Sequence, residues 1–127
     1  MERIAQAIAD IEKWFKELKK LDIKRLENLD DSRNFYTASM LIFSIINRTI
    51  DIGEELIAIK RLGFPSSYRE IFEILEKNRV IDEELMKKLS RLVFYRNLFA
   101  HEYFSFSKKD VFNTLQMIKN EKILKGI

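Results

Sequence analysis

Apolar residues recur at three- and four-residue steps along most of the chain, the spacing of one face of an α-helix. The first such stripe consists of Ile4, Ile8, Ile11, Phe15, Leu18 and Leu21. The pattern predicts five helices, over about 2–27, 32–62, 67–78, 82–103 and 107–124. Because long helices with short connections favour antiparallel neighbours, we expect an all-α fold, an up-and-down bundle of four to five helices.

Polar residues at the predicted helix ends agree with this division. Ser32 is the expected N-cap of the second helix, and Gly63 is its expected C-terminal stop. Ser67 and Ser107 each begin a capping-box pattern, so a helix is expected to start at each.

Two stretches are too apolar for helices with a single buried face. They are Ala38 to Ile46 in the second predicted helix and Leu92 to Ala100 in the fourth. A helix that is apolar around most of its circumference must be covered on more than one side. In a bundle this small, we expect one side of each stretch to face another chain, most simply in a two-fold symmetric homodimer.

Composition narrows the class of protein. The 127 residues are expected to form one domain, 1–127, without Cys and with a single His, which excludes a disulfide framework and a multi-His zinc site within one chain. The net charge of +3 permits a polyanionic partner without requiring one. The charged N-terminus and the absence of a long apolar run predict a cytoplasmic protein without a membrane anchor.

The helix predicted over 82–103 contains an unusual charged residue. At 100° per residue, Arg96 falls in the middle of the apolar stripe formed by Leu85, Leu89, Val93 and Ala100. An arginine there is costly unless its guanidinium is hydrogen-bonded and paired. Phe94, Leu98 and His101 project from roughly the opposite side, where they form a second apolar patch.

Plain structural roles compete with a functional reading of these residues. Arg96 could be an internal ion-pair partner of Asp51 or Glu54. His101 could be a hydrogen-bonded interface histidine, and Tyr103 could be a core residue with its hydroxyl at the surface. The step from Arg96 to His101 is about 140° around a straight helix, so one copy does not naturally aim both side chains at one point. Either the end of the helix bends, or the long Arg96 side chain reaches round, or two copies face each other. A two-fold axis at the second apolar patch would gather both pairs around one cleft.

The sequence RNLFAHEY, from Arg96 to Tyr103, resembles the R-x4-H-x-Y motif of HEPN ribonucleases, in the branch of the HepT toxins. Asn97 fits the polar residue that commonly follows the arginine of that family. The run Ile50 to Gly53 and the run Gly63 to Phe72 also resemble the corresponding family segments.

The resemblance implies a HEPN-like homodimer with Arg96 and His101 of both copies along a central groove. It implies RNA cleavage without a metal ion or other cofactor. It also implies a partner, a minimal nucleotidyltransferase (MNT) antitoxin, which would modify Tyr103 with adenylate. Asn97, Tyr103 and Asp51 are the expected supporting residues.

The residue types suit that chemistry. Cleavage that uses the 2′-hydroxyl of the RNA needs a proton acceptor, a proton donor and a cation at the phosphorane, which two histidines and an arginine can supply. Two other functions remain open. One is a non-catalytic subunit that binds RNA or a nucleotide beside a nucleotidyltransferase, and the other is a purely structural assembly subunit.

Overall fold

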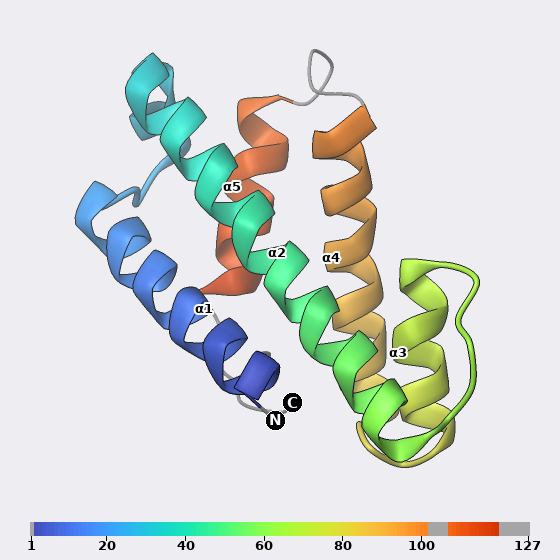
Figure 1. Cartoon of the computed structure of the whole chain (residues 1–127). Coiled ribbons are helices and arrows are strands. Elements are labelled where there is room, and N and C mark those ends of the chain that lie inside the picture. Colours follow the sequence, from blue (N-terminus) through green and yellow to red (C-terminus); the bar gives the residue numbers. More distant parts are fainter. Residues whose placement is uncertain (1, 102–106, 120–127) are drawn as a thin grey trace.

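The computed structural model describes residues 2–101 and 107–119, and all of its regular structure is helical. The elements are α1 (Glu2–Leu21), the short 3-10 helix η1 (Leu26–Asp30), α2 (Ser32–Lys60), α3 (Tyr68–Lys77), α4 (Glu83–His101) and α5 (Lys108–Ile118). Helix α2 is the longest and crosses the middle of the molecule, where it contacts all the others (Figure 1). The predicted all-α fold is confirmed.

The four longer helices α1, α2, α4 and α5 alternate in direction along the bundle, as expected (Figure 1). Helix α3 does not follow this rule, because it runs in the same direction as α2. Residues 61–67 connect the two helices and return along the outside of α3 (Figure 1). Seven extended residues span about 23 Å, whereas the ten residues of α3 rise by only about 15 Å. The connection is therefore long enough to carry the chain back along α3 to Tyr68, where that helix begins.

Backbone conformation explains where two helix ends differ from the prediction. Helix α1 ends at Leu21 and not at 27, because Asp22 adopts a left-handed conformation with φ of 50°. At the start of α2 the N-cap is Asp31, one residue before the predicted Ser32, and its carboxylate accepts a hydrogen bond from the Arg33 N–H at 2.8 Å. At the end of α2, Arg61 is left-handed, so the helix stops two residues before the predicted Gly63.

Other predicted caps are confirmed. The Ser67 hydroxyl accepts from the Glu70 N–H, and Ser107 and Asp110 form a reciprocal capping box. The Asp82 carboxylate accepts from the Leu85 N–H at 2.7 Å and so caps α4. The predicted continuations of α4 to Tyr103 and of α5 to Leu124 lie outside the described residues.

The core surrounds α2. Its most deeply buried side chains come from α2, α3, α4 and α5, and they include Ile42, Ile46, Phe72, Leu75, Leu89, Val111 and Leu115. Between α1 and α2, a smaller cluster contains Ile4, Ala7 and Ile11. The predicted α1 stripe is wrong at Ile8, which is exposed, because α1 packs chiefly against α2 and buries only a narrow face.

Gly53 lets α3 approach α2 closely. A Cβ atom at this position would lie 2.7 Å from Cγ2 of Ile71 and 3.2 Å from Cε1 of Phe72. The absence of a side chain therefore sets the distance between the two helices. Since Gly53 contacts the middle of α3, this packing also fixes where the N-terminal end of α3 lies along the bundle.

The two strongly apolar stretches are buried on one side only. Met40 in the first stretch and Phe94 in the second remain 66% and 62% exposed. In the described part of the chain, no helix has the length and apolarity that a membrane span requires. The expectation that another chain covers these sides stays a prediction.

Candidate functional site

Arg96 lies on the side of α4 that packs against α2, as the helical periodicity predicted. The neighbouring side chains on that side, Leu89, Leu92, Val93 and Phe99, are buried, and Arg96 itself is half-buried. Its guanidinium reaches the surface where α2, α3 and α4 meet.

Two amide side chains hold the guanidinium. The Nε of Arg96 donates to Oδ1 of Asn47 on α2 at 3.0 Å. Its Nη1 donates to Oδ1 of Asn97, the next residue of α4, at 3.1 Å. Asn47 thus ties α4 to α2 across 49 residues of sequence.

Two aromatic rings lie against the same guanidinium. The Cζ atom of Arg96 is 4.7 Å from the ring centroid of Tyr68 on α3 and 5.5 Å from that of Phe43 on α2. Contacts of this kind are attractive because the face of an aromatic ring is negative. Residues from three helices therefore fix the position of one cation.

The charge of Arg96 is not neutralised by its neighbours. Among the described residues, no carboxylate forms an ion pair with Arg96, and its hydrogen-bond acceptors are both neutral amides. A guanidinium has five N–H donors, so Nη2 and one N–H of Nη1 are left without a partner in this part of the chain. These groups form the end of the guanidinium, the edge that can bind two oxygens of a phosphate.

Asp51 does not join this site. Its Oδ2 accepts from Nη1 of Arg48 at 2.8 Å, and Asp10 on α1 accepts from Nε of the same arginine at 3.0 Å. The alternative in which Arg96 forms an internal ion pair with Asp51 or Glu54 is therefore wrong. Asn47 accepts the hydrogen bond from Nε of Arg96 instead.

The other predicted site residues lie near the end of α4. His101 is the last residue described in that helix, and its side chain lies outside the described residues. Tyr103 also lies outside the described residues. The structure thus brings Arg96 and Asn97 together and gives no position for the side chains of His101 and Tyr103.

A polar crevice between α1 and α2 surrounds Arg48. It has a volume of about 380 Å³ and is lined by Arg3, Gln6, Ala7, Arg48, Asp51, Glu54 and Glu55. The hydrogen bonds that Arg48 donates to Asp51 and Asp10 raise the pKa of Arg48 above its usual value. Burial, together with the charges of Asp51 and Glu55, raises the pKa of Glu54. Asp51 and Glu55 of α2 therefore form ion pairs on the α1 side, with Arg48 and Arg3, and Glu54 lines the same crevice.

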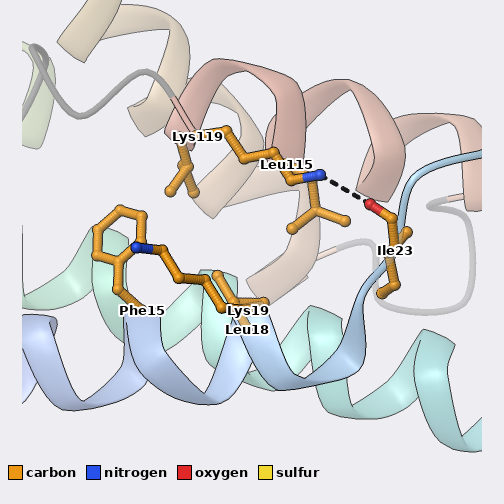
Figure 2. A pocket seen from close by; sticks show the side chains of 7 residues that line it. Phe15, Leu18, Lys19, Ile23, Leu115 and Lys119 are labelled. Carbon is orange, nitrogen blue, oxygen red and sulfur yellow. Dashed lines mark hydrogen bonds between the residues drawn. The ribbon is translucent and has the colours of Figure 1, made fainter.

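A small pocket between α1 and α5 has little capacity for a ligand. Its volume is about 60 Å³, and its walls are mainly the apolar side chains of Phe15, Leu18, Ile23, Leu115 and Ile118. The Lys119 ammonium closes one side by donating to the Ile23 carbonyl at 2.7 Å (Figure 2). This pocket has room for about two water molecules. Nor do the described residues contain a group of three His, Cys, Asp or Glu side chains able to hold a metal ion.

Asn47, Phe43 and Tyr68 are the residues that the sequence interpretation did not assign to the site. One signal was available for α2: Phe43 and Asn47 are four residues apart, so they share a face of the helix. Tyr36 and Met40 continue the same line along α2, and both are largely exposed. Tyr68 lies in the run Gly63 to Phe72 that resembles a family segment, but nothing in the sequence indicated its contact with Arg96, which depends on the return of the chain along α3.

Comparisons with known proteins identify a family and related folds. The model of the family described as Ribonuclease HepT-like matches residues 4–123. A curated relative, the mRNA nuclease HepT of Shewanella oneidensis, is 35% identical over 54 residues. That match covers 42% of this chain and 41% of the relative, so it spans less than half of either protein.

Two solved structures share the fold. One is YutE, a cytosolic protein of unknown function from Bacillus subtilis, with a TM-score of 0.81, 18% identity and coverage of 98% of this chain and 82% of that chain. The other is the tri-AMPylated HEPN toxin of Shewanella oneidensis in complex with its MNT antitoxin. Its TM-score is 0.75 at 22% identity, with coverage of 94% and 98%. At such identities the likeness shows the fold alone.

Proposed function

The chain belongs to the HepT-like ribonuclease family, and from that premise we propose that it is the toxin component of a HEPN/MNT toxin–antitoxin system, acting as a metal-independent endoribonuclease. The observation that carries this proposal is that no carboxylate among the described residues neutralises the charge of Arg96. A half-buried arginine that serves only the fold is usually paired with a carboxylate, as Arg48 is here. Arg96 is instead held by two amides, with its charge left for an anion from outside.

The proposed reaction uses the RNA's own nucleophile. A base removes the proton of the 2′-hydroxyl, and its oxygen attacks the adjacent phosphorus. The bond to the 5′-oxygen breaks as an acid protonates that oxygen, which leaves a 2′,3′-cyclic phosphate and a free 5′-hydroxyl. In this scheme Arg96 binds the phosphate oxygens and stabilises the added charge, and His101 supplies the base or the acid. Asn97 orients the guanidinium through Nη1.

The second histidine comes from a second copy of the chain in this proposal. Tyr36 and Met40 on α2 stay 68% and 66% exposed, and they lie on the same face of the helix as Phe43 and Asn47. Phe94 on α4 is exposed as well. A homodimer that covers apolar residues next to the Arg96 site would remove them from water and bring two copies of Arg96 and His101 to one groove.

The proposed partner is a minimal nucleotidyltransferase that adds adenylate to Tyr103. Support comes from the motif position of Tyr103 and from the Shewanella oneidensis HEPN toxin, which is AMPylated in its complex with an MNT antitoxin. Tyr103 belongs to the same motif as Arg96, so an adenylate on Tyr103 would add a negative phosphate near the site and repel an anionic substrate.

An RNA cleavage assay in EDTA tests the proposed activity. The purified protein is expected to cleave single-stranded RNA to products with 2′,3′-cyclic ends, and His101→Ala is expected to lower the rate at least about 100-fold. The control Arg91→Ala removes an exposed arginine from the same helix, and its rate should match that of the wild type. Equal rates for His101→Ala and wild type would reject the assignment. Binding of RNA without cleavage by the wild type would instead favour a non-catalytic RNA-binding subunit.

A further inference from the structure

We propose that Tyr68 is a substrate-contacting residue, on whose ring an unpaired nucleobase stacks next to the phosphate held by Arg96. This inference rests on the proposed function, since it names a subsite of the same RNA site. It assigns a role to the first residue of α3, which contributes neither a charge nor a proton-transfer group to the proposed reaction.

The position of Tyr68 is set by the fold. The connection 61–67 returns along α3, and close packing at Gly53 fixes that helix against α2. The ring of Tyr68 therefore lies against the guanidinium of Arg96, with 4.7 Å between the Cζ atom and the ring centroid. Tyr68 is also 38% exposed, so part of its surface remains accessible beside the guanidinium.

An open aromatic ring beside a phosphate-binding cation is the combination that single-stranded RNA sites use. A nucleobase is joined to its own phosphate through a single ribose, so a ring beside the phosphate-binding group lies within reach of that base. Stacking tolerates any base, because every base has a flat face. The subsite therefore selects unpaired RNA without selecting a sequence.

Supporting Arg96 does not by itself account for this ring. Asn47 and Asn97 already fix the guanidinium through hydrogen bonds, and Phe43 supplies a second aromatic contact. Phe43 is partly buried and packs against the core, which suits a supporting residue. Tyr68 is the more exposed of the two rings, although it lies nearer to the charge.

The test compares two ligands of equal charge: a uridine oligonucleotide, and an oligomer of abasic ribose phosphate of the same length. Binding is measured by fluorescence anisotropy in the His101→Ala background, which prevents cleavage. With Tyr68 present, we expect the base-containing ligand to bind about 5- to 100-fold more tightly. Tyr68→Phe should keep this preference, and Tyr68→Leu and Tyr68→Gln should bring the ratio of the two affinities close to one.

Phe64→Leu is the matched control, because Phe64 lies in the preceding connection, is 98% exposed and has no ring contact with Arg96 among the described residues. It should keep the full preference. The inference is overturned if Tyr68→Leu and Tyr68→Gln keep the ratio of the wild-type residue, or if Phe64→Leu loses as much as they do. Thermal melts check that each variant folds, and two ring-free variants protect the test against the misfolding of one.

The outcomes also separate this inference from the proposed function. If the wild type cleaves RNA but the ratio of the two affinities does not depend on Tyr68, the proposed function is supported and the subsite is rejected. If the wild type cleaves no RNA, and the preference for the base-containing ligand is lost in Tyr68→Leu and Tyr68→Gln, the subsite is supported and the nuclease assignment is rejected.

Discussion

Arg48 on α2 and Arg96 on α4 both lie over aromatic rings between packed helices, but their polar partners differ. Arg48 is 5.9 Å from the ring centroid of Trp14 and is paired with Asp10 and Asp51. Arg96 lies over Tyr68 and Phe43, and its hydrogen bonds go to the neutral amides of Asn47 and Asn97.

The difference separates a structural arginine from a binding arginine. Two carboxylates balance Arg48, and their hydrogen bonds raise its pKa, so its charge serves to join α1 to α2. An amide oxygen accepts the same hydrogen bond as a carboxylate but adds no charge. Asn47 therefore orients Arg96 without neutralising the charge that attracts a phosphate. Substitutions that remove either arginine, or give Arg96 an acidic partner, test this contrast.

The largest effect is expected from removing each arginine in turn. Arg96→Ala should lower RNA cleavage at least about 100-fold, because it removes a cation that binds the reacting phosphate. It should also lower the melting temperature by about 2–5 °C, because the contacts of Arg96 with Asn47 and two aromatic rings are lost. Arg48→Ala should leave cleavage unchanged and lower the melting temperature by about 2–5 °C, because it removes two partly exposed ion pairs. Cleavage rates and thermal melts of both variants measure the two losses. If Arg48→Ala lost cleavage and Arg96→Ala kept it, the contrast would be reversed.

A smaller effect is expected from giving Arg96 the setting of Arg48. Asn47→Asp keeps an oxygen for Nε but adds a negative charge beside the guanidinium. We expect RNA affinity to fall about 10-fold, and the slope of log affinity against log salt concentration to flatten by about 0.7, as one phosphate contact is lost. Asn113→Asp places the same charge on an exposed position of α5 and should leave the salt slope unchanged. An unchanged slope in Asn47→Asp would show that the neutrality of Asn47 is not needed.

The smallest effect concerns Glu54, in the crevice around Arg48. Burial, followed by the charges of Asp51 and Glu55, raises the pKa of this carboxyl, so the folded protein binds its proton more tightly than the unfolded chain does. The contribution of this carboxyl to the free energy of unfolding is therefore fully present at pH values below the ordinary pKa of a glutamate. It is lost as the pH rises through the raised pKa. Glu54→Gln removes this dependence and should raise the melting temperature at pH 7 by about 1 °C, with no gain near pH 4.

The control for this measurement is Glu12→Gln, which changes an exposed glutamate of α1 that does not line the crevice. Its melting temperature should follow that of the wild type at both pH values. A gain in Glu54→Gln that is equal at pH 4 and pH 7 would contradict an origin in the raised pKa.

The helical elements could be predicted from the sequence because their causes are local. Apolar spacing located the five α-helices that the structure describes, and Ser67 and Ser107 marked two of their starts, whereas the 3-10 helix η1 was not predicted. The early end of α1 could not be predicted, since Asp22 carries no signal for a left-handed conformation comparable to that of a glycine. Ile8 was misplaced for a different reason, because an apolar stripe does not reveal how wide a face its neighbour will cover.

The candidate site was predicted in part. The position of Arg96 within the buried stripe of α4 follows from periodicity alone, and Asn97 is its immediate neighbour in the chain. An acidic partner for Arg96 was one of the alternatives, because a buried cation is costly unless it is paired and hydrogen-bonded. The structure supplies Asn47 instead, and that choice turns an apparent structural arginine into a cation able to bind a phosphate.

By itself, the sequence determined the helices, their buried faces and the presence of an arginine within one of those faces, because each depends on residues within a few turns of one another. The tertiary structure decided which side chains surround Arg96. Asn47 is 49 residues away in sequence, and Tyr68 reaches the guanidinium because the connection 61–67 returns along α3 and Gly53 lets that helix pack closely on α2. Contacts of this kind depend on the direction and spacing of whole helices, and these are set by packing between distant segments.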